Sequence, residues 1–89
     1  LTIRPGDLTF EHVRAFVDAV VTVPDQAMID AIGWLFRHAR LVVEPSGSVT
    51  TAALMLGLGD VESSPGPVVA IVSGGNVEPR KYAEYITHD

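Results

Sequence analysis

The feature that most restricts the fold of this chain is the apolar run Val-Val-Ala-Ile-Val at residues 68–72. The run is continuous, whereas a strand with one face in water alternates between apolar and polar residues. A continuous apolar run is typical of a parallel strand that is covered on both faces. We therefore expect an α/β protein in which other elements lie on both sides of this segment.

The other segments alternate between helical and extended patterns. Apolar residues at positions 10, 13, 17 and 20 predict one helix, and those at 28, 32, 35, 36 and 39 predict a second. The β-branched residues 20–23 predict a strand that Pro24 ends, and the segment 41–47 begins as extended chain. A last helix is predicted to begin near Pro79 and to turn Tyr82 and Ile86 inward. This order is typical of an α/β fold with parallel strands.

The segment 48–59 is predicted to be a helix that is buried on every side, because it contains no charged residue. Gly57 and Gly59 are expected to close it, and the hydroxyls of Thr50 and Thr51 to bond back to carbonyls of the same helix. Together with residues 68–72, this helix needs more cover than 89 residues supply. We therefore expect residues 1–89 to be part of a larger domain, and their uncovered apolar surface to favour a homo-oligomer.

The composition argues against several classes of function. The net charge of −5 disfavours nucleic acid and anionic membranes as partners. The chain has no cysteine, and its three histidines lie far apart, so no metal site is expected. It contains no apolar stretch long enough to cross a bilayer and no secretory signal, which predicts a cytoplasmic protein. Because the sequence begins at Leu1 without an initiator Met, we expect it to have been cut from a longer chain.

The first candidate site is Ser73-Gly74-Gly75-Asn76, which directly follows the predicted strand 68–72. In parallel α/β sheets, ligands bind outside the carboxyl ends of the strands. Glycines at such a position let a flat or anionic ligand approach the backbone. The alternative is a tight turn that needs a positive φ at a glycine. The spacing alone leaves both interpretations open.

The second candidate is Glu44-Pro45-Ser46-Gly47. Glu44 ends an apolar run, where a carboxylate is unfavourable unless it is paired or faces a cavity. The alternative is a solvent-facing glutamate in a loop, with Ser46 capping the helix that follows.

Taken together, the two motifs resemble one family. Val-Glu-Pro-Ser-Gly at 43–47 followed by Ser-Gly-Gly-Asn at 73–76 is similar to the C-terminal part of threonine dehydratases and serine racemases. These are pyridoxal-phosphate enzymes of fold type II, the tryptophan-synthase-β-like group, and the resemblance covers nearly all of the chain. It implies that residues 1–89 are the C-terminal segment of the large, cofactor-binding domain, a partial three-layer parallel-sheet structure that is incomplete on its own.

The resemblance also implies roles for five residues around pyridoxal 5′-phosphate. Ser73 inherits the hydrogen bond to the pyridine nitrogen, and Gly74 and Gly75 line the pocket with their backbone. Glu44 corresponds to a glutamate near the edge of the ring, and Asn76 shapes the turn. A serine donates to an unprotonated ring nitrogen, which gives a milder electron sink than an aspartate partner does. That is sufficient for β-elimination, in which the leaving group departs as the α-proton is lost.

Other parts expected of such an enzyme are missing from this sequence. In the family, the Schiff-base lysine lies in an N-terminal Ser-x-Lys segment, whereas the only lysine here, Lys81, lies in the last predicted helix. The glycine-rich phosphate loop and the small domain are also missing, so no catalytic residue is expected within residues 1–89. The implied activity is that of a threonine or serine ammonia-lyase, completed by the N-terminal part of the enzyme and acting on a hydroxyamino acid.

Three alternatives to this function remain. The first is a serine racemase-like activity of the same family. The second is a non-catalytic α/β module used for assembly or anion binding. The third is a relative of cysteine synthase, although the pairing of the two motifs points away from it.

Overall fold

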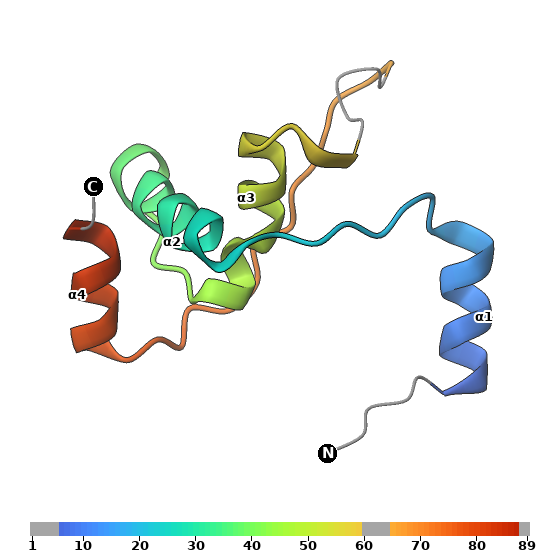
Figure 1. Ribbon diagram of the computed structural model, residues 1–89, viewed down its shortest axis with the longest axis horizontal. Helices are drawn as coiled ribbons and strands as arrows, with labels where there is room; N and C mark the ends of the chain where they lie inside the picture. Colours follow the sequence, from blue (N-terminus) through green and yellow to red (C-terminus); the bar gives the residue numbers. More distant parts are fainter. Residues whose placement is uncertain (1–5, 60–64, 88–89) are drawn as a thin grey trace.

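The computed structural model of the chain describes residues 6–59 and 65–87. Figure 1 shows four α-helices joined by long connections. A π-helix continues the second of them, and a 3₁₀ turn precedes the third. In chain order the elements are α1 (Asp7–Phe16), α2 (Asp25–Trp34), η1 (Leu35–Ala39), η2 (Pro45–Ser48), α3 (Val49–Met55) and α4 (Pro79–Thr87).

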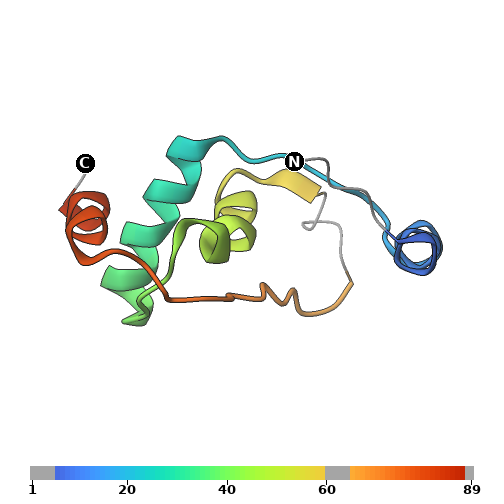
Figure 2. The same cartoon turned by 90° about the horizontal axis from the view of Figure 1, so that it is seen from below.

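Helix α2 is the centre of the packed part of the molecule. It lies between α3 and α4 in both views and also contacts η2 (Figures 1 and 2). Of the face predicted for this helix, Ile32 and Leu35 are buried and Met28 is half-buried, whereas Phe36 and Ala39 of η1 are exposed. The resulting core is small. The buried apolar residues of the described chain are Ala31, Ile32, Leu35, Val43 and Ala52.

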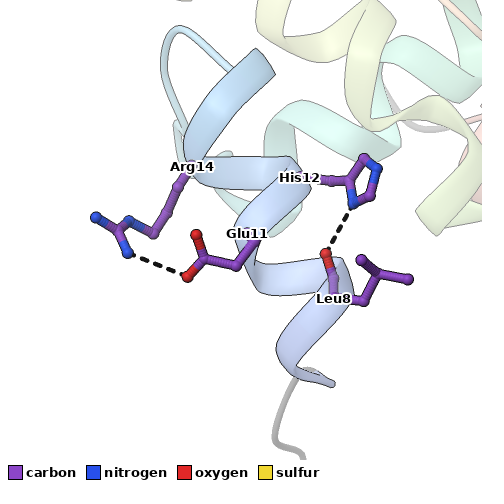
Figure 3. Close-up of polar contacts among 4 residues, drawn as sticks. All are labelled: Leu8, Glu11, His12 and Arg14. Carbon is purple, nitrogen blue, oxygen red and sulfur yellow. Dashed lines mark hydrogen bonds and ion pairs between the residues drawn. The ribbon is translucent and has the colours of Figure 1, made fainter.

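Helix α1 stands apart from this core and has no buried residue (Figure 2). Its side-chain contacts are local. Arg14 donates to the Glu11 carboxylate at 3.2 Å, and the His12 ring nitrogen Nδ1 lies 2.8 Å from the Leu8 carbonyl oxygen (Figure 3). Exposed pairs of this kind contribute only about 0.3–0.5 kcal/mol each. The helix therefore lacks the tertiary packing that stabilises most helices in proteins.

The prediction that the first helical face extends to residues 17 and 20 is wrong, since α1 ends at Phe16 and Val17 is already extended. The reason is the β-branched run that follows, because branched side chains restrict χ1 and favour extended backbone. Residues 17–24 instead form the long connection between α1 and α2 (Figure 1).

The two segments predicted as strands, 20–23 and 68–72, and the extended start of the segment 41–47 contain no helix, and within the described residues they form no sheet. A strand needs a partner backbone for its N–H and C=O groups, and the described part of the chain brings none of these segments into a ladder. Val69 and Ile71 are 83% and 73% exposed. The chain thus covers the apolar run 68–72 on one side only, at the half-buried Ala70 and Val72, where the sequence predicted cover on both faces.

Helix α3 is covered on one side. Thr51 and Ala52 are buried against the core, whereas Met55 and the following Leu56 are about half exposed. The prediction of a helix buried on every side is therefore wrong for this chain taken alone. The predicted glycine closure is confirmed, because the helix ends at Met55 and Gly57 follows at φ 71°.

The molecule exposes more surface than a compact domain of its mass. Its accessible area is 6983 Å², whereas a folded chain of this mass typically exposes about 5,000 Å². Its radius of gyration is 14.9 Å, against about 12 Å for a compact chain of this length. Its exposed residues include many large apolar ones, mainly valines, leucines and phenylalanines. None of the helices within residues 6–59 and 65–87 has the length and apolar content needed to cross a membrane.

Helix α4 packs on α2 through Tyr82 and Ile86, which are half-buried as predicted. The Arg37 guanidinium donates to the Ile86 carbonyl at 3.2 Å, and the Phe36 ring meets the edge of Tyr82 with centroids 6.1 Å apart. The Tyr82 hydroxyl is buried and has no hydrogen-bond partner among the described residues. Burial raises the pKa of this phenol.

This unpaired hydroxyl gives a prediction for Tyr82→Phe. An unsatisfied buried polar group is destabilising, so the substitution should raise the free energy of unfolding by up to about 1 kcal/mol. Because the pKa is raised in the folded state, the unfolded phenol ionises first as pH rises above about 10. The free energy of unfolding of the wild type should therefore fall as the pH rises above about 10. In Tyr82→Phe, the part of this fall that comes from Tyr82 should be absent.

Denaturant titrations of the full-length protein between neutral and alkaline pH measure both effects. Tyr85→Phe, which removes the other tyrosine hydroxyl of α4, is the control for a general loss of phenol ionisation. A clear drop in stability of Tyr82→Phe at neutral pH would mean that the hydroxyl has a partner.

Candidate functional site

The structure brings the two sequence motifs together. The Glu44 amide, at the start of η2, donates to the Gly74 carbonyl at 3.2 Å. The stretch 42–47 therefore lies against the stretch 71–75, although they are far apart in the sequence. We call this contact the motif junction.

Glycines make the motif junction possible. A Cβ built at Gly47 would overlap the Ser73 carbonyl oxygen, and one built at Gly75 would lie 2.7 Å from the Val42 carbonyl oxygen. Real Cβ atoms essentially never approach backbone this closely. At Gly47 and Gly75 the two stretches thus meet backbone to backbone.

Gly74 has two reasons to be glycine. Its φ is 78°, a left-handed conformation that is unfavourable for residues with a Cβ. In addition, Oε1 of Glu44 occupies the space where a Cβ of Gly74 would stand. The turn interpretation of Ser73–Asn76 is therefore confirmed for Gly74, whose Cβ side is filled by protein. The lining of a cofactor pocket by Gly74 and Gly75 stays a prediction.

The Glu44 side chain turns toward the second motif and is half-buried. The alternative that pairs a solvent-facing Glu44 with a Ser46 that caps the following helix is wrong, because Glu44 is half-buried and the N-cap position of α3 is Ser48, without a side-chain capping hydrogen bond. The hydroxyl that organises this turn belongs to Ser48, which the sequence analysis missed. It is buried and donates to the Pro45 carbonyl at 2.8 Å and to the Met28 carbonyl at 3.1 Å, tying η2 to α2.

Thr50 adds another link between the two stretches. Its hydroxyl donates to the Ile71 carbonyl at 2.7 Å, so the prediction that it bonds back to its own helix is wrong. The reason is that α3 runs beside residues 68–72, which offers the hydroxyl a carbonyl that no helix or sheet has already paired. The same expectation for Thr51 stays a prediction.

Ser73 and Asn76 are exposed, so the Ser73 side chain is accessible to a partner outside the motif junction. A hydroxyl can donate a hydrogen bond to a neutral aromatic nitrogen, and this matches the chemistry of a pyridine ring. The Val77 amide donates to the Gly75 carbonyl at 3.0 Å, which makes a three-residue turn centred on Asn76. The residues present therefore fit the ring-nitrogen side of pyridoxal phosphate.

The described part of the chain also has open grooves, among them the following two. The first, of about 430 Å³, is almost entirely apolar and is lined by Trp34, Leu35, Thr51, Leu54, Met55, Ala70 and Val72. The second, of about 310 Å³, is lined by Asp25, Met28, Ile29, Pro45 and Tyr85. Neither contains a basic residue for a phosphate group. Lys81 lies in the first turns of α4, where its amide bonds to the Glu78 carboxylate at 3.0 Å.

A family model described as "Pyridoxal-phosphate dependent enzyme" matches residues 1–74. Over 75 residues the chain is 41% identical to the L-threonine ammonia-lyase of Thermotoga maritima, covering 84% of this chain and 18% of that protein. Over 85 residues it is 35% identical to the catabolic L-threonine dehydratase TdcB of Staphylococcus aureus, and this match covers 94% of this chain and 25% of that protein. The Escherichia coli TdcB is 36% identical over 75 residues, which cover 84% of this chain and 23% of that protein. The chain thus spans a quarter or less of these relatives.

The contact between Glu44 and Gly74 predicts a difference between two glycine substitutions. Gly57→Ala adds a methyl group at positive φ in open space and should cost about 1–2 kcal/mol of stability. Gly74→Ala adds the same conformational strain together with the overlap on Oε1 of Glu44, so it should cost about 1 kcal/mol more. The measurement is the free energy of unfolding of each variant of the full-length protein.

The excess cost of Gly74→Ala should disappear when Glu44→Ala is added, because the second change removes the overlapping carboxylate. Equal losses for Gly57→Ala and Gly74→Ala would contradict the packing of Glu44 on Gly74.

Proposed function

The chain belongs to the family of pyridoxal-phosphate-dependent enzymes, and we propose that it is the C-terminal segment of the cofactor-binding domain of a threonine or serine ammonia-lyase. The observation that carries this proposal is the motif junction, which holds the backbone at Ser73 and leaves its hydroxyl accessible. The printed names of the similar proteins, threonine ammonia-lyase and threonine dehydratase, favour a hydroxyamino acid as the substrate.

The proposed domain is larger than this chain. In it, residues 20–23, 41–43 and 68–72 become strands of a parallel sheet in a three-layer fold, completed by strands and helices from the remaining part of the enzyme. The large exposed area and the exposure of Val69 and Ile71 support this proposal. We further propose that the complete enzyme is a cytoplasmic homo-oligomer, in which apolar surface left by the domain forms the subunit contact.

Bound pyridoxal phosphate supplies a conjugated ring that accepts the electron pair released when the α-proton of the substrate is removed. Ser73 would hold the bound ring by donating a hydrogen bond from its hydroxyl to the ring nitrogen. Because a serine hydroxyl does not transfer its proton to the nitrogen, the nitrogen stays neutral. Glu44 holds the Gly74 peptide, and Asn76 holds the turn beyond it.

The net reaction is the elimination of water from the amino acid, followed by hydrolysis to a 2-oxo acid and ammonia. The base that removes the α-proton is a lysine outside residues 1–89. The coding sequence upstream of Leu1 tests this directly: a Ser-x-Lys segment and a glycine-rich loop support the lyase, and their absence supports the non-catalytic assembly module. Formation of D-serine from L-serine, without 2-oxo acid, would identify the racemase.

Ser73→Ala in the full-length enzyme should lower turnover about tenfold, which corresponds to the loss of one hydrogen bond of roughly 1.4 kcal/mol. The cofactor should remain attached, because the covalent link is made elsewhere, and its absorbance should persist. The measurements are the rate of 2-oxo acid formation and the visible spectrum.

Ser46→Ala is the matched control, since it removes an exposed hydroxyl from the neighbouring turn. Unchanged turnover in Ser73→Ala would overturn the proposed role of this residue.

A further inference from the structure

We propose that Gly47 and Thr50 are positioning residues for the Ser73 hydroxyl. This inference rests on the proposed function, because it assigns them to the contact between Ser73 and the ring nitrogen. Neither residue needs to touch the cofactor. Both act on the backbone that carries Ser73.

Three contacts hold this backbone on one side. Thr50 binds the carbonyl of Ile71, two residues before Ser73, at 2.7 Å. The Glu44 amide binds the carbonyl of Gly74, one residue after it, at 3.2 Å. The carbonyl oxygen of Ser73 itself occupies the space beside the Gly47 Cα. The peptide groups around Ser73 are thus fixed before, at and after the residue that carries the hydroxyl.

The contact at Gly47 determines how closely the Ser73 backbone approaches η2. Because the atom facing Gly47 is a backbone oxygen, it cannot rotate away as a flexible side chain does. A methyl group at position 47 therefore has to displace the Ser73 peptide. Hydrogen bonds weaken steeply with distance and angle, so the hydroxyl would lose its alignment with a ring that other parts of the enzyme hold in place.

The contact at Thr50 acts on the same segment two residues earlier, at the Ile71 carbonyl. Its hydrogen bond to Ile71 prevents residues 71–73 from sliding past α3. Thr50→Val keeps the shape of the side chain and removes the donor, whereas Thr50→Ser keeps the donor and removes a methyl group. The two variants separate the hydrogen bond from the packing of this side chain.

The experiment uses the full-length enzyme loaded with pyridoxal phosphate that is labelled with nitrogen-15 in the ring. The chemical shift of the ring nitrogen reports its hydrogen bond directly and does not depend on turnover. Wild type, Ser73→Ala, Gly47→Ala and the double variant are compared. Gly66→Ala is the matched control, because a Cβ at Gly66 meets nothing within 4 Å.

We expect Gly47→Ala to move the ring-nitrogen resonance in the same direction as Ser73→Ala, and to lower turnover about tenfold. When Gly47→Ala is added to Ser73→Ala, we expect little further movement of the resonance and a further change in turnover of less than about twofold. The reason is that both substitutions remove the same interaction. Gly66→Ala should match wild type.

A resonance that moves in Ser73→Ala and stays at the wild-type position in Gly47→Ala would overturn the role of Gly47 and leave the proposed function intact. A resonance that does not move in Ser73→Ala would overturn the proposed function itself. Additive effects in the double variant would mean that Gly47 acts on the fold in general and not through Ser73.

If Gly47→Ala prevents folding, the two variants Thr50→Val and Thr50→Ser test the positioning role instead. Thr50→Val should shift the resonance toward that of Ser73→Ala, and Thr50→Ser should restore it. Equal spectra for Thr50→Val and wild type would overturn the positioning role, because the hydrogen bond to Ile71 would then have no effect on the ring contact.

Discussion

The close approach of two backbone stretches, 42–47 and 71–75, is the constraint on which the candidate site depends. Glycine carries an entropic cost in any fixed conformation, and this junction brings Gly47 close in space to Gly74 and Gly75. The cost is offset because no residue with a Cβ allows the Ser73 and Val42 carbonyls to lie where they do. The glycines of the junction therefore cost conformational entropy, and in return the backbone at Ser73 is fixed.

The two motifs were predictable as candidates, but their contact was not. Glycine-rich turns after apolar runs are visible in the sequence, and their pairing indicated a pyridoxal-phosphate enzyme. The reason for glycine at 47 is a carbonyl oxygen that lies 26 positions further along the chain, and no local pattern encodes it. Ser48 was missed, and the partner of Thr50 was predicted wrongly, for the same reason, since their hydroxyls bind the distant carbonyls of Met28 and Ile71.

Helices and strands differed in how far they were predictable, and the cause is where each finds its hydrogen-bond partners. A helix satisfies its backbone within its own segment, so α2 and α4 form as their apolar periodicity predicted. A strand takes its partners from other segments. Residues 68–72 have the composition of a buried strand, but the described chain offers no backbone to pair with them. A sheet is therefore a property of the longer protein that we propose.

The difference between contacts within one segment and contacts between distant segments also explains why the candidate site lies at the edge of the packed region. The core around Ile32 and Val43 holds η2 through the buried Ser48, and η2 in turn holds the backbone at Ser73. The chain of contacts runs from the core to the hydroxyl and ends at the side chain that is left accessible. A ligand that binds only the folded form stabilises it by mass action. In the proposed enzyme, the cofactor ring would therefore strengthen the same contacts that position Ser73, so that cofactor binding and completion of the domain favour each other.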